Sequence, residues 1–326
     1  MVRTWLLSVS VLCLSIQAGF AQIPPPNPFP SAVPLEPATP ISTYSYSPLN
    51  DRNGSSLVGN VNLDGPRDNL GWFGAVDLDL LGSHVTNQLT APVTVAGRTD
   101  QVSLPAATLH WTVAPRFELG YRLGQGAGEF LISTRFLETF GSTTTPAFDP
   151  AGNAGFLHSR LALSVTDLDY ANQELSLQPW FDMKWRFGVR LADLYFSSSE
   201  TSPLLYQRVS DHFFGAGPHA ALELWHPVND SRFGLFGKLD AAGVFGKVRQ
   251  GFEETLPGPI SGYTPQSQLM PSAMLNVQAG IGWTPRDNWR FSAGYSYEHW
   301  WDAAYVNASR GEVATQGVFL RGEWKY

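Results

Sequence analysis

The side chains in this sequence with most scope for chemistry are its histidines, and their spacing does not build a reactive site. The chain has seven histidines and one cysteine, Cys13. His158 and His219 fall on different predicted strands, and neither has a nearby cysteine or an H-x-x-x-H partner. Zinc sites use closely spaced Cys and His ligands of that kind. The sequence therefore predicts no metal and no cofactor.

Hydrolase chemistry is the next possibility. An enzyme acting on lipids would need a serine and a histidine on the outer wall of the protein, with a carboxylate or amide orienting the histidine. His226 and His299 could be placed there, but no nucleophile-elbow motif accompanies them. The stretch GQGAG (Gly124–Gly128) lacks a strand-to-helix context, so it indicates a turn and not a phosphate loop. We therefore expect no enzyme.

The charged residues follow a different rule, because they alternate with large apolar residues. Between Phe181 and Leu191 every second residue is large and apolar, and a charge or a glycine stands between each pair. A period of two places successive side chains on opposite faces of a β-strand. This stretch is thus predicted to be a strand with one apolar and one charged face.

The same alternation recurs from Gly71 to the C-terminus and predicts an all-β fold. It indicates about ten antiparallel strands, with eight to twelve possible. Their centres are Trp72–Leu81, Leu109–Leu123, Phe130–Phe136, Leu157–Val165, Phe181–Leu191, Phe214–Leu224, Phe233–Asp240, Leu275–Trp283, Trp289–Glu298 and Val318–Tyr326.

The connecting segments alternate between short and long. Tight turns rich in Gly, Pro, Asn and Asp are predicted at Gly124–Gly128, Tyr170–Glu174, Pro227–Ser231 and Pro285–Asn288. Long polar loops are predicted at Gly82–Ser103, Gly141–Gly155, Ser197–Asp211, Arg249–Ser272 and Asp302–Glu312. Regular alternation of this kind is typical of an up-and-down transmembrane β-barrel.

Alternation alone does not separate a membrane barrel from a soluble β domain, whose apolar face would be its core. Composition fits either, with 15% charged residues, 13% aromatic residues and a mean hydropathy of −0.11. Three features favour a membrane barrel, whose apolar face meets lipid. They are small residues opposite many apolar faces, aromatics at strand ends, and a C-terminal strand, VFLRGEWKY, that can close a ring. We therefore expect a barrel with its apolar face outward.

Parity then assigns each side chain to one face. The predicted lumen-lining residues are Asp77, Asp79, Arg116, Glu118, Arg122, Arg135, Arg160, Asp182, Lys184, Arg186, Arg190, Glu223, Lys238, Asp240, Arg290, Glu298, Arg321 and Glu323. The aromatics predicted to lie at the membrane interfaces are Trp72, Tyr121, Phe130, Trp283, Trp289, Trp300, Trp301, Trp324 and Tyr326.

A barrel of about ten strands is narrow, so the charged lumen has two interpretations. In one, the charges pair across the lumen and close it as a polar plug. In the other, they line a thin aqueous path, and Arg122, Arg160, Arg186 and Arg190 bias it towards anions. Local pairing and a small conducting path can coexist.

The N-terminal part differs from the rest of the chain. Arg3, the apolar stretch Trp5–Ile16 and the small residues up to Ala21 predict a signal peptide, residues 1–21, cleaved after Ala21. Residues 22–70 are dense in Pro, Ser and Asn and are predicted to be a disordered periplasmic linker, although they could also thread into the barrel or bind an envelope partner. Residues 71–326 would form the barrel.

Charge and cysteine content exclude two classes of protein. The chain has 28 acidic against 21 basic residues, and nucleic-acid binding requires a basic surface. Cys13 lies in the predicted signal peptide, so the exported chain would carry no disulfide framework.

Several stretches resemble known families. GWFGAVDLDLL, APRFELGYRLGQGAGEFLISTRF, DLDYANQELSLQPWFDMKWRFGVRLADL and FGAGPHAALELWHPVNDSRFGLFGKLDAAGVFGKV are similar to the Legionella-type pore-forming outer-membrane proteins and to barrel porins of planctomycete-like bacteria. The resemblance covers roughly Gly71 to Tyr326 and implies an outer-membrane barrel with pore formation. The terminal GEWKY also resembles the signal read by outer-membrane assembly machinery, although that signal more often ends in Phe.

We therefore expect a barrel in the outer membrane of a Gram-negative bacterium, exported by a cleaved signal peptide. The function predicted first is a narrow, porin-like channel for ions or small polar solutes. The alternative is a closed barrel with a structural or surface-interaction role, acting through its long extracellular loops. Expected partners are membrane lipid, the assembly machinery and small solutes, with no nucleic acid.

Overall fold

The computed structural model describes residues 70–87, 90–95, 98–103, 105–124, 127–146, 148–149, 151–172, 175–178, 181–228, 231–255, 266–306 and 309–325. The predicted signal peptide and all but the last residue of the predicted linker lie outside the described residues. Within these ranges, no helix has the length and apolarity that a membrane crossing requires.

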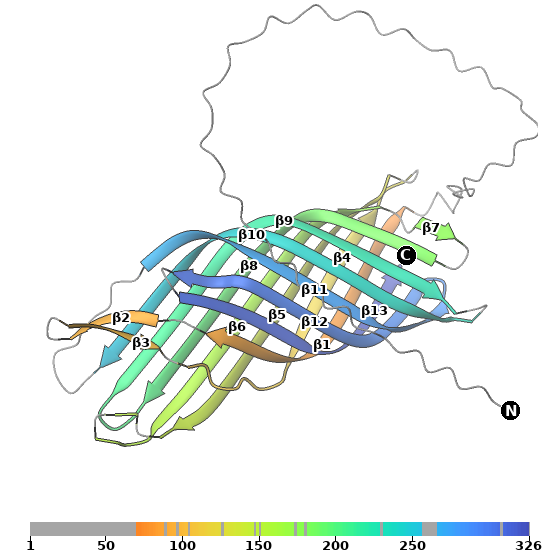
Figure 1. The fold of residues 1–326 in the computed structure, drawn as a ribbon. Coiled ribbons are helices and arrows are strands. Elements are labelled where there is room, and N and C mark those ends of the chain that lie inside the picture. Colours follow the sequence, from red (N-terminus) through yellow and green to blue (C-terminus); the bar gives the residue numbers. More distant parts are fainter. Residues whose placement is uncertain are drawn as a thin grey trace, which may run out of the picture. The chain divides into compact units, whose positions relative to one another are not determined.

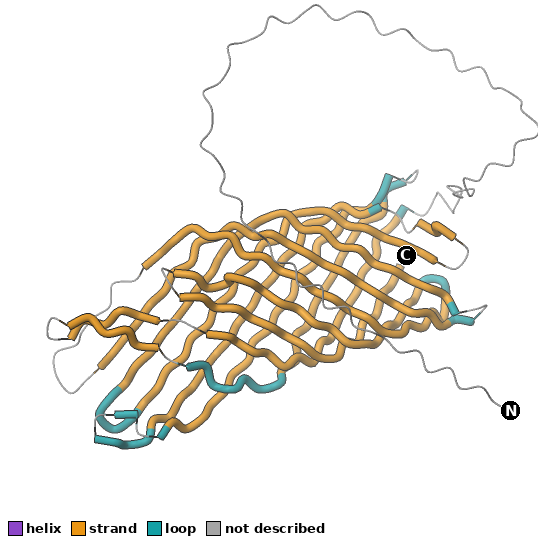
Figure 2. Tube along the Cα trace, in the orientation of Figure 1, coloured by secondary structure: helices purple, strands orange, loops and turns teal. Residues whose placement is uncertain are grey.

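Ten long strands make up the wall of the protein (Figures 1 and 2). They are β1 (Gly71–Asn87), β4 (Thr112–Arg122), β5 (Glu129–Thr145), β6 (Gly155–Ala171), β8 (Phe181–Thr201), β9 (Tyr206–Pro227), β10 (Phe233–Thr255), β11 (Gln266–Arg286), β12 (Trp289–Val306) and β13 (Ser309–Lys325). Two shorter strands, β2 (Thr90–Val95) and β3 (Arg98–Ser103), form a separate hairpin. A third, β7 (Leu175–Gln178), lies beside β8.

Antiparallel pairing closes these ten strands into a ring. The last strand, β13, pairs with β1, where Phe73 lies opposite Lys325. On the other side of the ring, β6 pairs with β8 through a long register from Phe156 to Ala171. Every long strand therefore has two neighbours, and the predicted ten-stranded antiparallel barrel is confirmed.

The two ends of the barrel differ in their connections. We call the end where β1 begins and β13 ends the proximal end, and the opposite end the distal end. The tight turns predicted at Gly124–Gly128, Pro227–Ser231 and Pro285–Asn288 join wall strands at the proximal end. The fourth proximal connection is longer than the predicted turn Tyr170–Glu174, because it contains β7.

At the distal end the prediction of long loops is wrong for much of their length. Most of the expected loop Ser197–Asp211 is strand, since β8 runs to Thr201 and β9 begins at Tyr206. Strands β5 and β10 likewise extend into predicted loops. Several wall strands thus have 21 to 23 residues, whereas a bilayer crossing needs about 9–11. The wall continues well beyond the part that faces lipid.

The proximal part has apolar side chains outside and charges inside. Leu78, Phe187 and Leu320 are about half exposed on the outer wall, whereas Asp77 and Arg186 are buried within. We call the outward apolar zone the lipid band. It runs from Trp72, Phe130, Trp283 and Trp289 near the proximal end to Trp111, Phe140, Phe214, Phe245 and Trp301 towards the distal end.

Beyond the lipid band the two faces of β6 exchange their character. On β6 the odd-numbered residues point inward throughout, yet they change from Asp167 in the proximal part to Leu161 and Leu157 in the distal part. The prediction that Leu157–Val165 faces outward is therefore wrong. Its physical reason is the solvent: distal to the band the outer wall meets water, so the apolar face turns inward as in a soluble protein.

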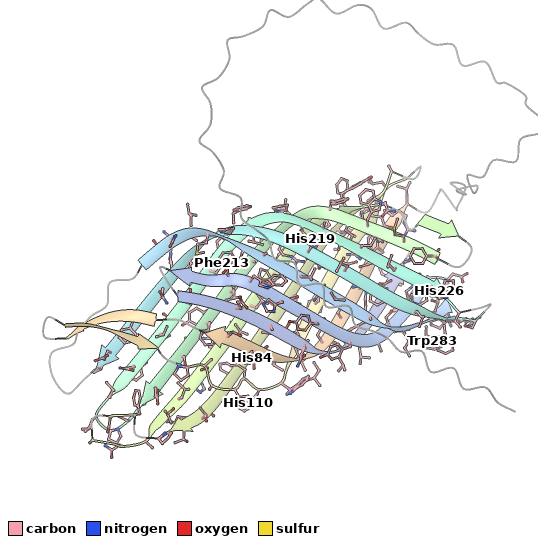
Figure 3. The ribbon with its side chains drawn as sticks, in the orientation of Figure 1. His84, His110, Phe213, His219, His226 and Trp283 are labelled. Atoms are coloured by element: carbon pink, nitrogen blue, oxygen red, sulfur yellow. The ribbon has the colours of Figure 1, made fainter. Side chains whose placement is uncertain are left out.

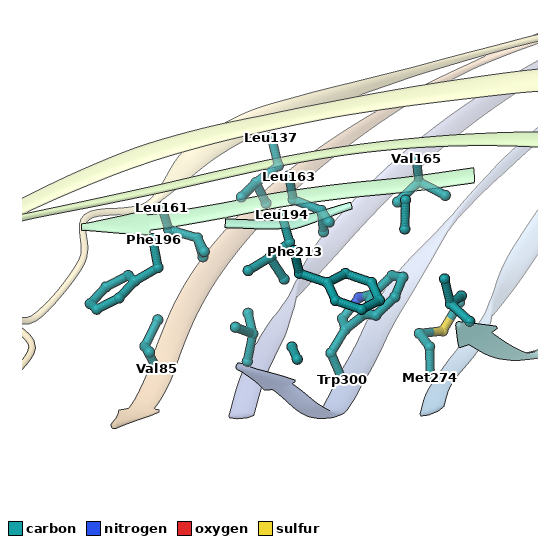
Figure 4. Close-up of a cluster of buried hydrophobic side chains, with 14 of the residues drawn as sticks. Val85, Leu137, Leu161, Leu163, Val165, Leu194, Phe196, Phe213, Met274 and Trp300 are labelled. Atoms are coloured by element: carbon teal, nitrogen blue, oxygen red, sulfur yellow. The ribbon is translucent and has the colours of Figure 1, made fainter. Parts of the chain in front are cut away.

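These inward apolar residues form a hydrophobic core in the distal interior (Figure 4). Phe213, Phe196, Leu194 and Trp300 are each at most 2% exposed, and Met274 packs in the same cluster. The core draws on strands from all around the ring, so it ties the distal wall together across the barrel axis.

We expect the core to be a major source of stability, and adjacent residues of β9 test this. Phe213 is fully buried in the core, and its neighbour Phe214 is 57% exposed on the outer wall. Phe213→Ala should lower the free energy of unfolding by about 3–5 kcal/mol because it leaves a cavity. Phe214→Ala should cost only about 1–2 kcal/mol because lipid fills the space. Urea titration of both variants refolded in vesicles measures the difference, and equal costs would contradict the inward core.

Candidate functional site

The interior of the lipid band holds most of the residues that sequence parity placed in the lumen. The buried ones are Asp77, Asp79, Arg116, Glu118, Arg135, Arg186, Arg190, Lys238, Asp240, Glu298 and Arg321. The partly exposed ones are Arg122, Asp182, Lys184, Glu223, Arg290 and Glu323. Whether these residues line a path for solutes stays a prediction.

One predicted lumen residue, Arg160, lies on the outer wall instead. Its side chain is 46% exposed and pairs with Glu138 at 2.6 Å. It lies on the distal part of β6, where the outer face meets water. The prediction assumed that the leucines of this strand point outward, which placed Arg160 on the inner face. His158, two residues before Arg160 on the same face of β6, is exposed outside as well.

The predicted interfacial aromatics are also divided by the structure. Trp72, Phe130, Trp283, Trp289 and Trp301 are exposed on the outer wall, and Tyr121 and Trp324 are partly exposed. Trp300 is fully buried inside, so its predicted interfacial position is wrong. The cause is the strict alternation of β12, in which two adjacent tryptophans must point to opposite faces. Tyr326 lies outside the described residues.

Arg190 is at the centre of one interior network. Its guanidinium donates to both carboxylate oxygens of Asp167, at 2.6 and 2.8 Å, and to Asp240 at 3.1 Å. His219 lies between Asp169, 2.8 Å from Nδ1, and Asp240, 2.9 Å from Nε2. Figure 3 shows His219 along the middle of the barrel. Two cationic groups thus hold three carboxylates from β6 and β10 together.

This cluster also satisfies the spacing of metal ligands, since donor atoms of Asp167, Asp169 and His219 lie within 4.8 Å of one another. Carboxylate oxygens only accept hydrogen bonds, so both ring nitrogens of His219 must donate for its two contacts to form. A histidine that donates from both nitrogens has no lone pair for a metal. In the arrangement seen here, Asp169 and Asp240 contact the two ring nitrogens, and the group forms a hydrogen-bonded network.

A second network lies closer to the proximal end. Arg186 donates to Glu118 at 2.6 Å and pairs with Glu223 at 2.8 Å. Arg321 pairs with Asp77 at 3.0 Å and with Glu118 at 3.4 Å. Each arginine thus bridges carboxylates from different strands, which links the wall across its narrow bore.

Glu298 connects the charged zone to the distal core. It accepts hydrogen bonds from Arg135 at 2.7 Å, from Asn276 at 2.9 Å and from the indole N–H of Trp300 at 2.7 Å. The polar edge of Trp300 therefore faces the charges while its ring belongs to the apolar core.

At the proximal end the interior opens into a small hollow of about 30 Å³. Among the residues lining it are Asp182, Lys184, Glu223, Arg290 and Glu323. Lys184 pairs with Glu129, which also accepts from Arg122 at 2.8 Å. The hollow thus has a polar lining that carries both acidic and basic groups.

The distal mouth is covered by the segment that follows β3. The N–H of Ala107 donates to the Ser159 hydroxyl at 2.9 Å, and Ser198 donates to the carbonyl of Pro105 at 2.9 Å. Leu109 is buried in the distal core. This segment therefore enters the barrel and adds to the apolar filling.

Sequence reasoning missed Glu129, Asp167 and Asp169, all of which bear on these networks. The signal for the last two was present, because Asp167 and Asp169 alternate with Leu168 and Tyr170 in a pattern that continues β6. It went unused because that stretch borders the predicted turn Tyr170–Glu174.

Comparison with solved structures shows which fold this is. The chain is similar to the outer membrane protease OmpT from Escherichia coli, with 11% identity over 78% of this chain and 96% of that chain, at a TM-score of 0.50. It also aligns with Neisserial surface protein A, NspA (14% identity, 78% and 97% covered, TM-score 0.25). A third match is a major outer membrane protein from Thermus thermophilus (11% identity, 77% and 99% covered, TM-score 0.30).

At this identity the likeness to OmpT shows the fold alone, and that fold is an outer-membrane β-barrel. The other two scores are too low to argue from. No family profile and no curated protein matches the chain, so the resemblance to the Legionella-type and planctomycete-like families stays a prediction.

The Arg190 network should be far more important for stability than the exposed arginine pair on the outer wall. Arg190→Ala leaves Asp167 and Asp240 buried without their cation and should cost about 3–5 kcal/mol. Arg160→Ala removes a half-exposed pair and should cost about 1 kcal/mol or less. Urea unfolding of the two variants measures both values. Equal effects would show that the interior pairing is not what holds the barrel.

A distal connection provides a pH test outside the membrane-spanning segments. Asp149 accepts hydrogen bonds from the N–H groups of Ala151 and Asn153, at 3.0 and 2.8 Å, and from Ser202 at 3.1 Å. Burial opposes the carboxylate charge, but these hydrogen bonds outweigh it and lower the pKa of Asp149. A lowered pKa stabilises the folded state above the ordinary value of about 3.9, and this stabilisation is lost as the pH falls through the lowered value.

We therefore expect the thermal unfolding midpoint of Asp149→Asn to lie below that of the unaltered protein at pH 6. The gap should narrow as the pH falls through the lowered pKa and close once the carboxyl is protonated in both states. Asp287→Asn, in the exposed β11–β12 turn, is the charge-matched control and should show no gap at any pH in this range. A gap that widens in acid would show that the carboxylate is not the stabilising form.

Proposed function

We propose that this chain is an outer-membrane β-barrel whose lumen is closed by its own side chains and which acts through its distal extension. The observation that carries this proposal is the distal core. Phe213 and Trp300 have no exposed surface, and Phe196 has only 2%. A core packed this closely in a ten-stranded bore leaves no room for a hydrated ion.

The outer wall supports membrane insertion. Apolar side chains such as Val76, Ile281 and Leu320 are 45% to 62% exposed, which is costly in water and favourable in lipid. The ring has no free strand edge, as a lipid-spanning sheet requires. The predicted signal peptide and the barrel fold together favour the outer membrane of a Gram-negative bacterium, reached through its assembly machinery.

The distal extension is the part available to other molecules. It consists of the distal ends of the long strands, the described parts of their connections and the β2–β3 hairpin, which extends from the distal end (Figure 1). Its outer face is polar, with Arg208, Arg249 and Glu253 exposed, so it suits an aqueous surface. This matches the closed, surface-interaction alternative expected from the sequence.

The narrow channel remains the second candidate, and the proximal hollow is the observation that favours it. Lys184 and Arg290 line that hollow together with acidic groups, as expected of the mouth of a polar path. Conduction would require the distal core and the Arg190 network to separate. A channel of this kind would be closed in the arrangement seen here.

Conductance of the predicted mature chain, residues 22–326, in a planar lipid bilayer tests the closed barrel against the channel. We expect the unaltered protein to be silent. The double variant Phe213→Ala, Trp300→Ala should conduct in discrete steps because it removes the largest side chains of the core. The control Phe214→Ala, Trp301→Ala removes the adjacent outward side chains and should stay silent. Heat-modified mobility on gels confirms folding of each protein.

Discrete steps from the unaltered protein would overturn the closed barrel. If their ion selectivity then shifts in Arg186→Glu, the channel is established and Arg186 faces its path. If the core-depleted variant is folded and silent, the closure lies in the charged networks and not in the distal core.

A further inference from the structure

A cluster of basic side chains stands on the outer wall directly distal to the lipid band. We call it the basic patch; it comprises Arg160, Arg208, His212, Lys247 and Arg249, from strands β6, β9 and β10. Four of the five are exposed on the outer face, and the His212 side chain is 40% exposed. Neither the ion-pair networks nor the distal core uses any of them.

Strand register brings these residues together. His212 lies opposite Tyr195 of β8 on one side and opposite Arg249 of β10 on the other. Lys247 lies opposite Phe214, one of the aromatics at the distal limit of the lipid band. Neighbouring strands are about 4.8 Å apart, so a patch over four strands spans about 14 Å, the size of a lipid headgroup.

Tyr195 fixes part of the patch. The Arg160 guanidinium lies 5.7 Å from the centre of the Tyr195 ring, and Arg208 donates to the Tyr195 hydroxyl at 2.9 Å. Lys247 and Arg249 have no ion-pair partner among the described residues. The patch thus combines oriented cations with two that are free to take an anion.

The exposed basic side chains described distal to the lipid band lie on one side of the barrel. On the opposite wall, at a similar level, the outward residues of β1 and β13 include His84, Thr86, Glu312 and Gln316. Among the described side chains, that wall carries no lysine or arginine distal to the lipid band. A general preference for charge near headgroups would not produce this asymmetry.

A groove in the outer wall adjoins the patch. It has a volume of about 420 Å³, with Val113 and Phe136 on its apolar side and Arg160, Ser164 and Tyr195 on its polar side. Two acidic residues also line the groove. Glu138 is paired with Arg160, and Asp193 is paired with His212. An apolar floor that runs into a cationic rim matches a molecule with an acyl chain and an anionic head.

We propose that the basic patch and this groove bind a phosphate-bearing, acylated lipid of the leaflet on the distal side. Arginine and lysine bind phosphate through charge-assisted hydrogen bonds, and basic pockets on membrane proteins select anionic headgroups. A lipid is the occupant because the cations begin where the apolar wall ends, with Lys247 next to Phe214. The inference rests on the proposed membrane placement.

Native mass spectrometry of the folded protein, titrated with phosphatidic acid or with phosphatidylcholine of the same acyl chains, tests the proposal. The unaltered protein should bind phosphatidic acid at least tenfold more tightly. Lys247→Gln, Arg249→Gln should weaken that binding about 10- to 30-fold, as expected for two cations at a membrane surface. The control His84→Glu, Thr86→Glu lowers the net charge equally on the opposite wall and should change the affinity less than twofold.

Three outcomes overturn the proposal. They are equal affinity for the two lipids, equal loss in the control, and full displacement by millimolar inorganic phosphate, which would show a site for free anions. If the double variant does not fold, the single variants Lys247→Gln and Arg249→Gln replace it, each with about a fivefold expected loss. Failure of the unaltered protein to insert into vesicles, judged by heat-modified mobility, would instead contradict the membrane placement and thus the proposed function.

Discussion

The structure depends on one constraint, which is that a sheet crossing lipid must satisfy every backbone hydrogen bond within itself. The pairing of β1 with β13 meets this constraint, because it joins the first and last wall strands over a long register from Phe73 to Asn87. Closing ten strands fixes a narrow bore. Everything inside must then fit that bore, which is why interior side chains from opposite strands, such as Arg186 and Glu118, come into contact.

Within the bore, the charges stabilise the barrel only as a set. A buried arginine is costly unless carboxylates surround it, and Arg190 contacts both Asp167 and Asp240. The arrangement also depends on a side chain that is absent. Gly188 lies between β6 and β9, and a Cβ there would come within 2.2 Å of the Asp169 carboxylate. Glycine thus leaves the space through which Asp169 reaches His219, two strands away.

The number and order of the strands could be predicted from sequence because alternation and tight turns are local signals. The opening stretch Phe181–Leu191 appears in the structure as the expected strand, with Arg186 and Arg190 inside. Alternation shows which residues share a face, but not which medium that face meets. Arg160 was predicted on the wrong face because it lies beyond the lipid band. Trp300 was predicted on the wrong face because its neighbour Trp301 is also aromatic, so the sequence does not show which of the two points outward.

The partners within the interior could not be predicted, because they join residues far apart in the chain. Asp77 and Arg321 meet only when the ring closes, and Glu118 meets Arg186 across the bore. The distal strand extensions were hidden for a different reason. Segments such as Ser197–Thr201 carry small polar residues that also occur in loops, and only pairing with neighbours makes them strands.

The exchange of faces along β6 also limits the tendency of this strand to aggregate. A strand that was apolar on both faces would be a continuous apolar run, prone to aggregate before it reaches the membrane. β6 avoids such a run, because its polar face changes sides at the boundary. In the lipid band that face points inward and carries Asp167 and Asp169; beyond the band it points outward and carries Arg160. On this strand the interior charges and the apolar core residues therefore have one cause: the apolar face meets lipid within the band, and the polar face meets water beyond it.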